Sequence, residues 1–238
     1  MGKAVVMGAG GGIGAALVRQ LAGRSPAGAV LALSRRRPPD LPEGVTWAGA
    51  DLEDEASLAE AAALAAEGEA PDLVIVATGR LQVAGKGPEK SWRALESEAL
   101  AEAFRVNAIG PALVAKHFLP LLPRDRRAVF AALSARVGSI GDNRLGGWYG
   151  YRASKAALNQ LVRTLSVELA RQRPQALCVA LHPGTVATGL SAPFQAGVAE
   201  EKLFTPDFAA ERLLRVIDGL EPHQTGGFFA WDGEAIPW

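Results

Sequence analysis

The segment Met7-Gly8-Ala9-Gly10-Gly11-Gly12-Ile13-Gly14 indicates how this chain folds. It follows the short apolar run 4–7 and leads into residues 13–22, whose apolar side chains have helical spacing. A glycine-rich turn between a strand and a helix lets the backbone approach a pyrophosphate, and the amides at the helix N-terminus attract that anion. Such turns also occur where no ligand binds, but its place in the first strand–turn–helix unit favours a dinucleotide-binding site.

Apolar runs alternate with helical segments along the rest of the chain. We expect strands at residues 4–7, 29–33, 45–48, 72–77, 128–133, 176–181 and 227–230, and helices at 13–22, 56–66, 98–122, 151–171 and 207–219, with Ser97 as an N-cap. This repeated order predicts an α/β fold. The predicted architecture is a single doubly wound, Rossmann-type domain over residues 1–238, with a parallel sheet of about seven strands and helices on both faces.

Composition excludes several classes of protein. The 238 residues contain 25 Lys and Arg against 25 Asp and Glu, and this zero net charge argues against nucleic acid or an anionic membrane as partner. The single cysteine, Cys178, is expected in the core, and with three scattered histidines it predicts neither a disulfide nor a metal site. No uncharged apolar stretch approaches the ~20 residues of a membrane helix. We therefore expect a cytoplasmic protein.

The end of the second expected strand, Ser34-Arg35-Arg36-Arg37, bears on the choice of cofactor. A carboxylate at this position would bind the ribose hydroxyls of NAD(H) and repel a 2′-phosphate. Guanidinium groups instead match a phosphate in charge and geometry. We expect Ser34, Arg35 and Arg36 to favour NADP(H), with NAD(H) as a second cofactor and a solvated basic loop as the alternative interpretation.

Two further strand ends could contact a dinucleotide. Asp51-Leu52 follows the third expected strand, where the carboxylate could accept a hydrogen bond from the adenine amino group. The alternative role of Asp51 is to cap the next helix. The fourth strand leads into Ala77-Thr78-Gly79, whose small side chains leave room for a ribose and the nicotinamide.

The chain has only two tyrosines, and one of them, Tyr151, is followed four residues later by Lys155. This spacing puts both side chains on one face of a helix. A nearby ammonium favours the phenolate, so we expect Lys155 to lower the pKa of Tyr151 toward the working range of a general acid and base. The spacing is common in ordinary surface pairs and becomes specific only together with the glycine turn.

These motifs resemble the short-chain dehydrogenase/reductase family over the full chain, and within it the branch of C-factor and sniffer-type carbonyl reductases. The matching segments are the turn Gly8–Gly14, Asn107, the pair Tyr151 and Lys155, and Pro183-Gly184-Thr185-Val186-Ala187-Thr188, which in the family closes over the nicotinamide carboxamide. Methionine replaces the threonine that usually begins the turn. Both asparagines that usually follow the fourth strand are absent, because Ala77-Thr78 stands there.

The resemblance implies a mechanism. Tyr151 would protonate a carbonyl oxygen while the nicotinamide delivers hydride to its carbon, and Lys155 would hold the nicotinamide ribose. Asn107 would hold a proton-relaying water at a local helix bulge, its alternative being a polar residue on a solvated helix face. The family serine aligns less clearly: we favour Ser134, at the end of the fifth strand, over Ser139.

Two classes of function follow. The first is an NADP(H)-dependent oxidoreductase acting on a small carbonyl/alcohol pair, forming a homodimer or homotetramer as the family does. The second is a non-catalytic nucleotide-binding regulatory or signalling protein on the same fold. The expected substrate lid, residues 189–204, has no charge cluster and indicates a small or apolar substrate. His182 is expected to line the cofactor pocket rather than act as a base.

Overall fold

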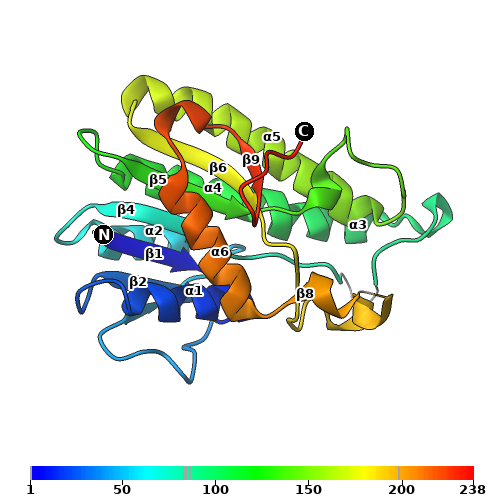
Figure 1. Cartoon of the computed structure of the whole chain (residues 1–238), viewed down its shortest axis with the longest axis horizontal. Coiled ribbons are helices and arrows are strands. Elements are labelled where there is room, and N and C mark those ends of the chain that lie inside the picture. The colour runs from blue at the N-terminus through cyan, green and yellow to red at the C-terminus, as the bar shows by residue number, and fades with distance from the viewer. Residues whose placement is uncertain (1, 83–84, 86, 198) are drawn as a thin grey trace.

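The computed structural model describes residues 2–82, 85, 87–197 and 199–238. Seven parallel strands form the main sheet in the order β3-β2-β1-β4-β5-β6-β9 (Figure 1). Their bounds are β1 Lys3–Met7, β2 Val30–Ser34, β3 Thr46–Gly49, β4 Pro71–Val76, β5 Ala128–Leu133, β6 Ala176–His182 and β9 Phe228–Ala230. Two short strands, β7 Thr185–Val186 and β8 Leu203–Phe204, pair separately. The predicted doubly wound parallel sheet is therefore confirmed.

Helices cover both faces of the sheet, as predicted. Their bounds are α1 Gly12–Ala22, α2 Glu55–Ala66, α3 Ser97–Phe104, α4 Gly110–Phe118, α5 Tyr149–Gln172 and α6 Pro206–Gly219. Side chains of α1 and α6 share one buried cluster, and those of α2, α4 and α5 share another on the opposite face. Strand β5 contributes to both, because Val129 belongs to the first cluster and Phe130 to the second. Its continuous apolar sequence follows from burial on both faces.

The sheet reverses its winding direction at β1, which pairs with β2 on one side and β4 on the other. Ligands of doubly wound sheets bind outside the carboxyl ends of the strands at such a switch point. The glycine turn follows β1 there and Ala77 follows β4, and the amide of Ala77 donates to the carbonyl of Met7 at 2.8 Å. The fold therefore brings the two predicted cofactor segments side by side.

The helix predicted over residues 98–122 is interrupted. A π-helical turn, Arg105–Ile109, joins α3 to α4, and a 3-10 turn, Leu119–Leu121, ends the segment. The bulge expected at Asn107 is thus present. Ser97 is not the N-cap that we predicted: Glu96 has the extended cap conformation and Ser97 is the first helical residue.

Helix α2 is capped by Asp54, not by Asp51. The Asp54 carboxylate accepts from the amides of Ala56 at 3.1 Å and Ser57 at 3.4 Å, whereas Asp51 Oδ1 accepts from Glu53 in the preceding turn. Capping side chains satisfy amides that have no partner within the helix. The alternative role considered for Asp51 therefore belongs to a neighbouring residue.

We predict that Asp54→Ala lowers the free energy of unfolding by about 1 kcal/mol, because two amides of α2 lose their acceptor. Asp54→Ser, which keeps a capping oxygen, should retain most of the stability. Urea unfolding followed by circular dichroism measures both. A larger loss in Asp51→Ala than in Asp54→Ala would contradict this assignment of the cap.

Candidate active site

Two pockets lie at the carboxyl edge of the sheet. Most of the predicted site residues line one pocket or the other. The first, the glycine-turn pocket, has a volume of about 570 Å³; of the predicted residues, it is lined by Gly8, Gly10, Gly11, Ser34, Arg35, Arg36, Asp51, Leu52, Ala77, Thr78 and Gly79. The second, the Tyr151 pocket, has about 470 Å³; its predicted residues are Ile13, Ser134, Tyr151, Pro183, Gly184, Thr185, Val186 and Thr188. Gly12, Gly14, Asn107 and Lys155 lie outside both linings.

The glycine turn needs glycine at two positions for different reasons. Gly8 has a φ of +93°, which other residues rarely adopt. A Cβ on Gly14 would lie 2.1 Å from the carbonyl oxygen of Gly8, so a side chain there would push the turn and α1 apart. Helix α1 begins at Gly12 with no side-chain cap, which leaves its first amides available to an anion in the pocket.

The basic segment after β2 also borders this pocket. Arg35, Arg36 and Arg37 line it, are exposed, and form no ion pair with any residue that the structure describes. Ser34 is engaged locally: its hydroxyl donates to the carbonyl of Arg36 at 2.8 Å and accepts from the indole of Trp47 at 3.0 Å. Ser34 therefore shapes the turn that presents three guanidinium groups, none of which is neutralised by a described residue.

Tyr151 lies in the first turn of α5, and Lys155 one turn later is 2% exposed. The Lys155 Nζ donates to the carbonyl of Leu133 at 2.8 Å and lies 5.9 Å from the centre of the Tyr151 ring. The Tyr151 hydroxyl has no hydrogen-bond partner among the described residues, so it is available to a ligand in the Tyr151 pocket.

The expected lowering of the Tyr151 pKa is not found in this structure. Burial raises the pKa of Tyr151 to about 12, and burial likewise lowers the pKa of Lys155 to about 7. The physical reason is desolvation, which disfavours the charged form of each group. The Lys155 ammonium is also directed to a strand carbonyl instead of the phenol oxygen.

The two candidate serines differ in position. Ser134 directly follows β5 and lines the Tyr151 pocket, and its hydroxyl donates to Asn159 Oδ1 at 2.6 Å. Ser139 is 1% exposed, does not line that pocket, and accepts from the amide of Asp142 at 3.1 Å. The geometry agrees with the preference for Ser134.

Asn107 is completely buried, so the alternative of a solvated helix face does not apply. Its Oδ1 accepts from the amide of Arg80 at 2.8 Å, and its Nδ2 donates to the carbonyl of Arg80 at 2.8 Å and to Ser154 Oγ at 3.1 Å. Both amide hydrogens are thereby used. Asn107 clamps the loop after β4 to α5, one turn from Tyr151.

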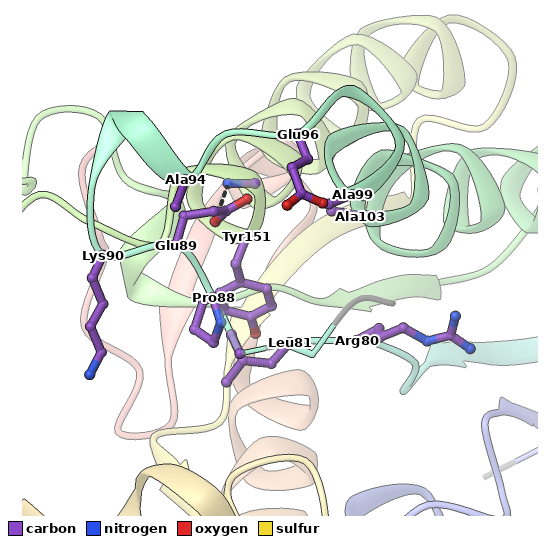
Figure 2. A pocket seen from close by; sticks show the side chains of 12 residues that line it. Arg80, Leu81, Pro88, Glu89, Lys90, Ala94, Glu96, Ala99, Ala103 and Tyr151 are labelled. Carbon is purple, nitrogen blue, oxygen red and sulfur yellow. Dashed lines mark hydrogen bonds between the residues drawn. The ribbon is translucent and has the colours of Figure 1, made fainter. Parts of the chain in front are cut away.

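A residue that the sequence did not reveal, Glu89, holds the start of the helix that carries Tyr151. Its carboxylate accepts from the amide of Gly150 at 3.1 Å (Figure 2). Its carbonyl accepts from the amide of Trp148. Glu89 and Tyr151 line a small pocket of about 180 Å³, which shares Tyr151 and Leu81 with the Tyr151 pocket. Glu89 lies 61 residues from Gly150, and no local motif marks this contact.

Aromatic side chains form part of the Tyr151 pocket. Trp148 has a left-handed backbone, with φ of 54°, and lies edge-on to both Tyr151 at 6.3 Å and Phe194 at 5.4 Å. Phe194 belongs to the 3-10 turn Ala192–Gly197 in the expected lid. His182, expected to line the cofactor pocket, lines the Tyr151 pocket together with Pro183 and Gly184, which are expected at the nicotinamide. Burial lowers the pKa of His182 to about 4.

Among the described residues, no helix is long and apolar enough to cross a membrane. The same residues form no group of three or more His, Cys, Asp or Glu side chains that could hold a metal. Cys178 is buried in the core, as expected, and burial raises the pKa of its thiol to about 12.

Known proteins share both the sequence pattern and the fold. The family model for short chain dehydrogenases matches residues 2–199. C-signal of Myxococcus xanthus is 41% identical over 140 residues, which are 58% of this chain and 78% of that protein. The carbonyl reductase Sniffer of D. melanogaster superposes with a TM-score of 0.86 at 26% identity, with full coverage of both chains. An NADPH-bound carbonyl reductase from chicken fatty liver has a TM-score of 0.84 at 27% identity, covering 99% of this chain and 98% of its own.

These matches confirm the resemblance to the C-factor and sniffer-type branch that the motifs indicated. The match to the family model covers most of the sequence and includes the glycine turn, Tyr151, Lys155 and the start of the expected lid. The chain therefore belongs to the short-chain dehydrogenase family of oxidoreductases.

Proposed function

We propose that this protein is an NADP(H)-dependent oxidoreductase that transfers hydride between the nicotinamide and a small carbonyl/alcohol substrate, with Tyr151 as the acid and base. The single observation that carries this proposal is the position of Tyr151. Its unpartnered hydroxyl borders the Tyr151 pocket, next to the pocket formed by the glycine turn, with the buried Lys155 one helical turn away. A non-catalytic nucleotide-binding protein would need the glycine-turn pocket, but it would not need an unpartnered tyrosine hydroxyl beside it.

The residues present fit NADP(H). Gly8 to Gly14 and the uncapped start of α1 would hold the pyrophosphate, and Arg35 with Arg36 would hold the 2′-phosphate. The contacts to the adenine and nicotinamide sides would come from Asp51 and Leu52, from Ala77 to Gly79, and from Pro183 to Thr188. When bound, the nicotinamide supplies or accepts the hydride. The NADPH-bound chicken carbonyl reductase supports this choice of cofactor.

Burial raises the pKa of Tyr151 to about 12, so the phenol is protonated at neutral pH and holds the proton that reduction of a carbonyl requires. The raised pKa also makes the phenol a weak acid, so proton transfer needs a nearby positive charge to stabilise the phenolate. Lys155 would hold the nicotinamide ribose and, once its ammonium lies near the phenol oxygen, would stabilise the phenolate that remains. Asn107 would support a proton-relaying water only through groups other than its amide hydrogens, since both are already bonded.

Ser134 would donate a second hydrogen bond to the same carbonyl oxygen. Its hydroxyl hydrogen now points to Asn159, but a serine hydroxyl rotates freely about its C–O bond and can turn toward a ligand. Position supports this role, because Ser134 and Tyr151 line one pocket.

We also propose that residues 1–238 act as one domain, in the cytoplasm, as a homodimer or homotetramer. In this family the long helix and the helix carrying the tyrosine form the subunit contacts. The corresponding helices here expose the apolar side chains Ile109 and Val167, which are 50% and 47% accessible. Exposed apolar groups on these two helices support such an assembly.

We predict that Tyr151→Phe lowers kcat for NADPH-dependent reduction of aldehydes, ketones or quinones by about 100-fold or more, because the proton donor is lost. NADPH binding, measured by fluorescence titration, should remain near that of the wild type. The loss of NADPH absorbance measures turnover. A wild-type protein that binds NADPH but shows no Tyr151-dependent oxidation across the panel would rule out the proposed reaction.

The serine assignment predicts different effects for two matched substitutions. Ser134→Ala should lower kcat by about 100-fold, since one hydrogen-bond donor to the developing oxyanion is removed. Ser139→Ala should leave kcat close to that of the wild type, because Ser139 faces Asp142 and not the pocket. Steady-state kinetics of both variants decide the assignment, and the reverse order of effects would transfer the role to Ser139.

We predict that Arg35→Asp shifts the preference of the enzyme from NADPH toward NADH. The new carboxylate would repel the 2′-phosphate and could accept hydrogen bonds from the ribose hydroxyls of NADH. The ratio of kcat/KM for the two cofactors measures the shift. Arg215→Asp, on the exposed face of α6, is the matched control for charge. An unchanged ratio in Arg35→Asp would remove Arg35 from the cofactor site.

A further inference from the structure

The Tyr151 pocket has an excess of positive charge. Its charged lining consists of Arg136, Arg144 and Arg152 against one carboxylate, Asp142. All four come from the segment between β5 and the first turn of α5. The lid itself contributes Leu190, Ser191 and Phe194 and no charge. In a chain whose net charge is zero, this is a local surplus of two positive charges.

Two of the three guanidinium groups are tied to the protein in different ways. Arg152 donates to the carbonyls of Gly147 at 3.0 Å and Val137 at 3.2 Å, which fixes the segment but leaves its charge uncompensated. Arg136 lies 3.5 Å from Asp142, with half of its side chain exposed. Among the described residues, Asp142 therefore pairs with Arg136 and with neither of the other two arginines.

Arg144 is the least engaged of the three. It donates to the carbonyl of the adjacent Asn143 at 3.3 Å and has no carboxylate within 4.0 Å among the described residues. It is exposed at the pocket next to Leu145. A guanidinium in this state can offer its planar pair of donors to a carboxylate without breaking an existing ion pair.

The histidine of the pocket, His182, adds no positive charge at neutral pH. Burial lowers its pKa to about 4, and the charge of Arg136 lowers it further while that of Asp232 raises it. His182 is therefore neutral at pH 7. The remaining lining is largely apolar and aromatic, with Trp148, Val186, Leu190 and Phe194 around Tyr151.

We propose that the preferred substrates are carbonyl compounds, or the corresponding alcohols, that carry a carboxylate on an apolar or aromatic body. This proposal rests on the proposed function. The apolar body would lie against Trp148 and Phe194, the carbonyl would reach Tyr151, and Arg144 with Arg136 would bind the carboxylate. Lid residues 189–204 alone indicated a small or apolar substrate, because the four charged residues of the lining lie outside the lid, between β5 and the first turn of α5.

A matched pair of aldehydes tests the proposal: 4-carboxybenzaldehyde and its uncharged methyl ester, each reduced with saturating NADPH. We expect kcat/KM to be about tenfold higher for the acid, the effect of one charge-assisted hydrogen bond. The preference should fall with added salt, which screens exposed charges. Arg144→Gln combined with Arg136→Gln should abolish the preference, so that the ratio of kcat/KM for the acid to that for the ester falls to about one. Arg215→Gln, an exposed arginine on α6, should retain it.

Equal kcat/KM for acid and ester in the wild type, or a preference that survives in the double variant, would overturn the charge assignment and leave the proposed reaction intact. If neither aldehyde reacts, the result excludes only these two compounds as substrates.

Binding measured by calorimetry then tests the charge assignment without turnover. With NADP⁺ bound, the protein should bind benzoate about tenfold more tightly than benzamide. Equal binding of the two would also overturn it.

Discussion

The buried ammonium group of Lys155 constrains the arrangement of the whole site. A cation this deep in a protein is costly unless polar groups face it, and here the carbonyl of Leu133 at the end of β5 accepts its hydrogen bond. Close packing follows: a Cβ on Gly138 would lie 2.8 Å from the Lys155 Cβ, and one on Gly79 would lie 3.5 Å from its Nζ. Small residues at these positions let α5 approach the ends of β4 and β5, which brings Tyr151 to the sheet edge.

Two polar contacts hold α5 in this position from other parts of the chain. Asn107, at the π-helical turn, binds both backbone groups of Arg80 and the hydroxyl of Ser154. Glu89 binds the amides at the start of α5. These contacts tie the loop after β4 to α5 at two places, one just before Tyr151 through Glu89 and one just after it through Asn107 and Ser154. The geometry of the pocket depends on both contacts. Each contact satisfies a buried or partly buried polar group, which would lower the stability of the fold if it had no hydrogen-bond partner.

Much of the fold could be predicted from local sequence, because strands buried on both faces read as continuous apolar runs; residues 128–133 coincide with β5. The bulge at Asn107 and the placement of Ser134 also followed from sequence. Contacts between residues far apart in the sequence could not be predicted in this way. Glu89 reaches α5 across 61 residues, Asp54 replaces Asp51 as a cap, and Arg144 faces the pocket only through the path of its loop. The direction of the Tyr151 pKa shift depends on burial, which spacing does not reveal.

Hydride transfer at the Tyr151 pocket is the central claim, and isotope transfer measures it most directly. The protein is incubated with an aldehyde and NADPH that carries deuterium on one face of nicotinamide C4, and the alcohol is examined by NMR. The account predicts deuterium on the carbinol carbon from one of the two labelled faces and not from the other. An alcohol without deuterium from either face, or no alcohol despite bound NADPH, would contradict it.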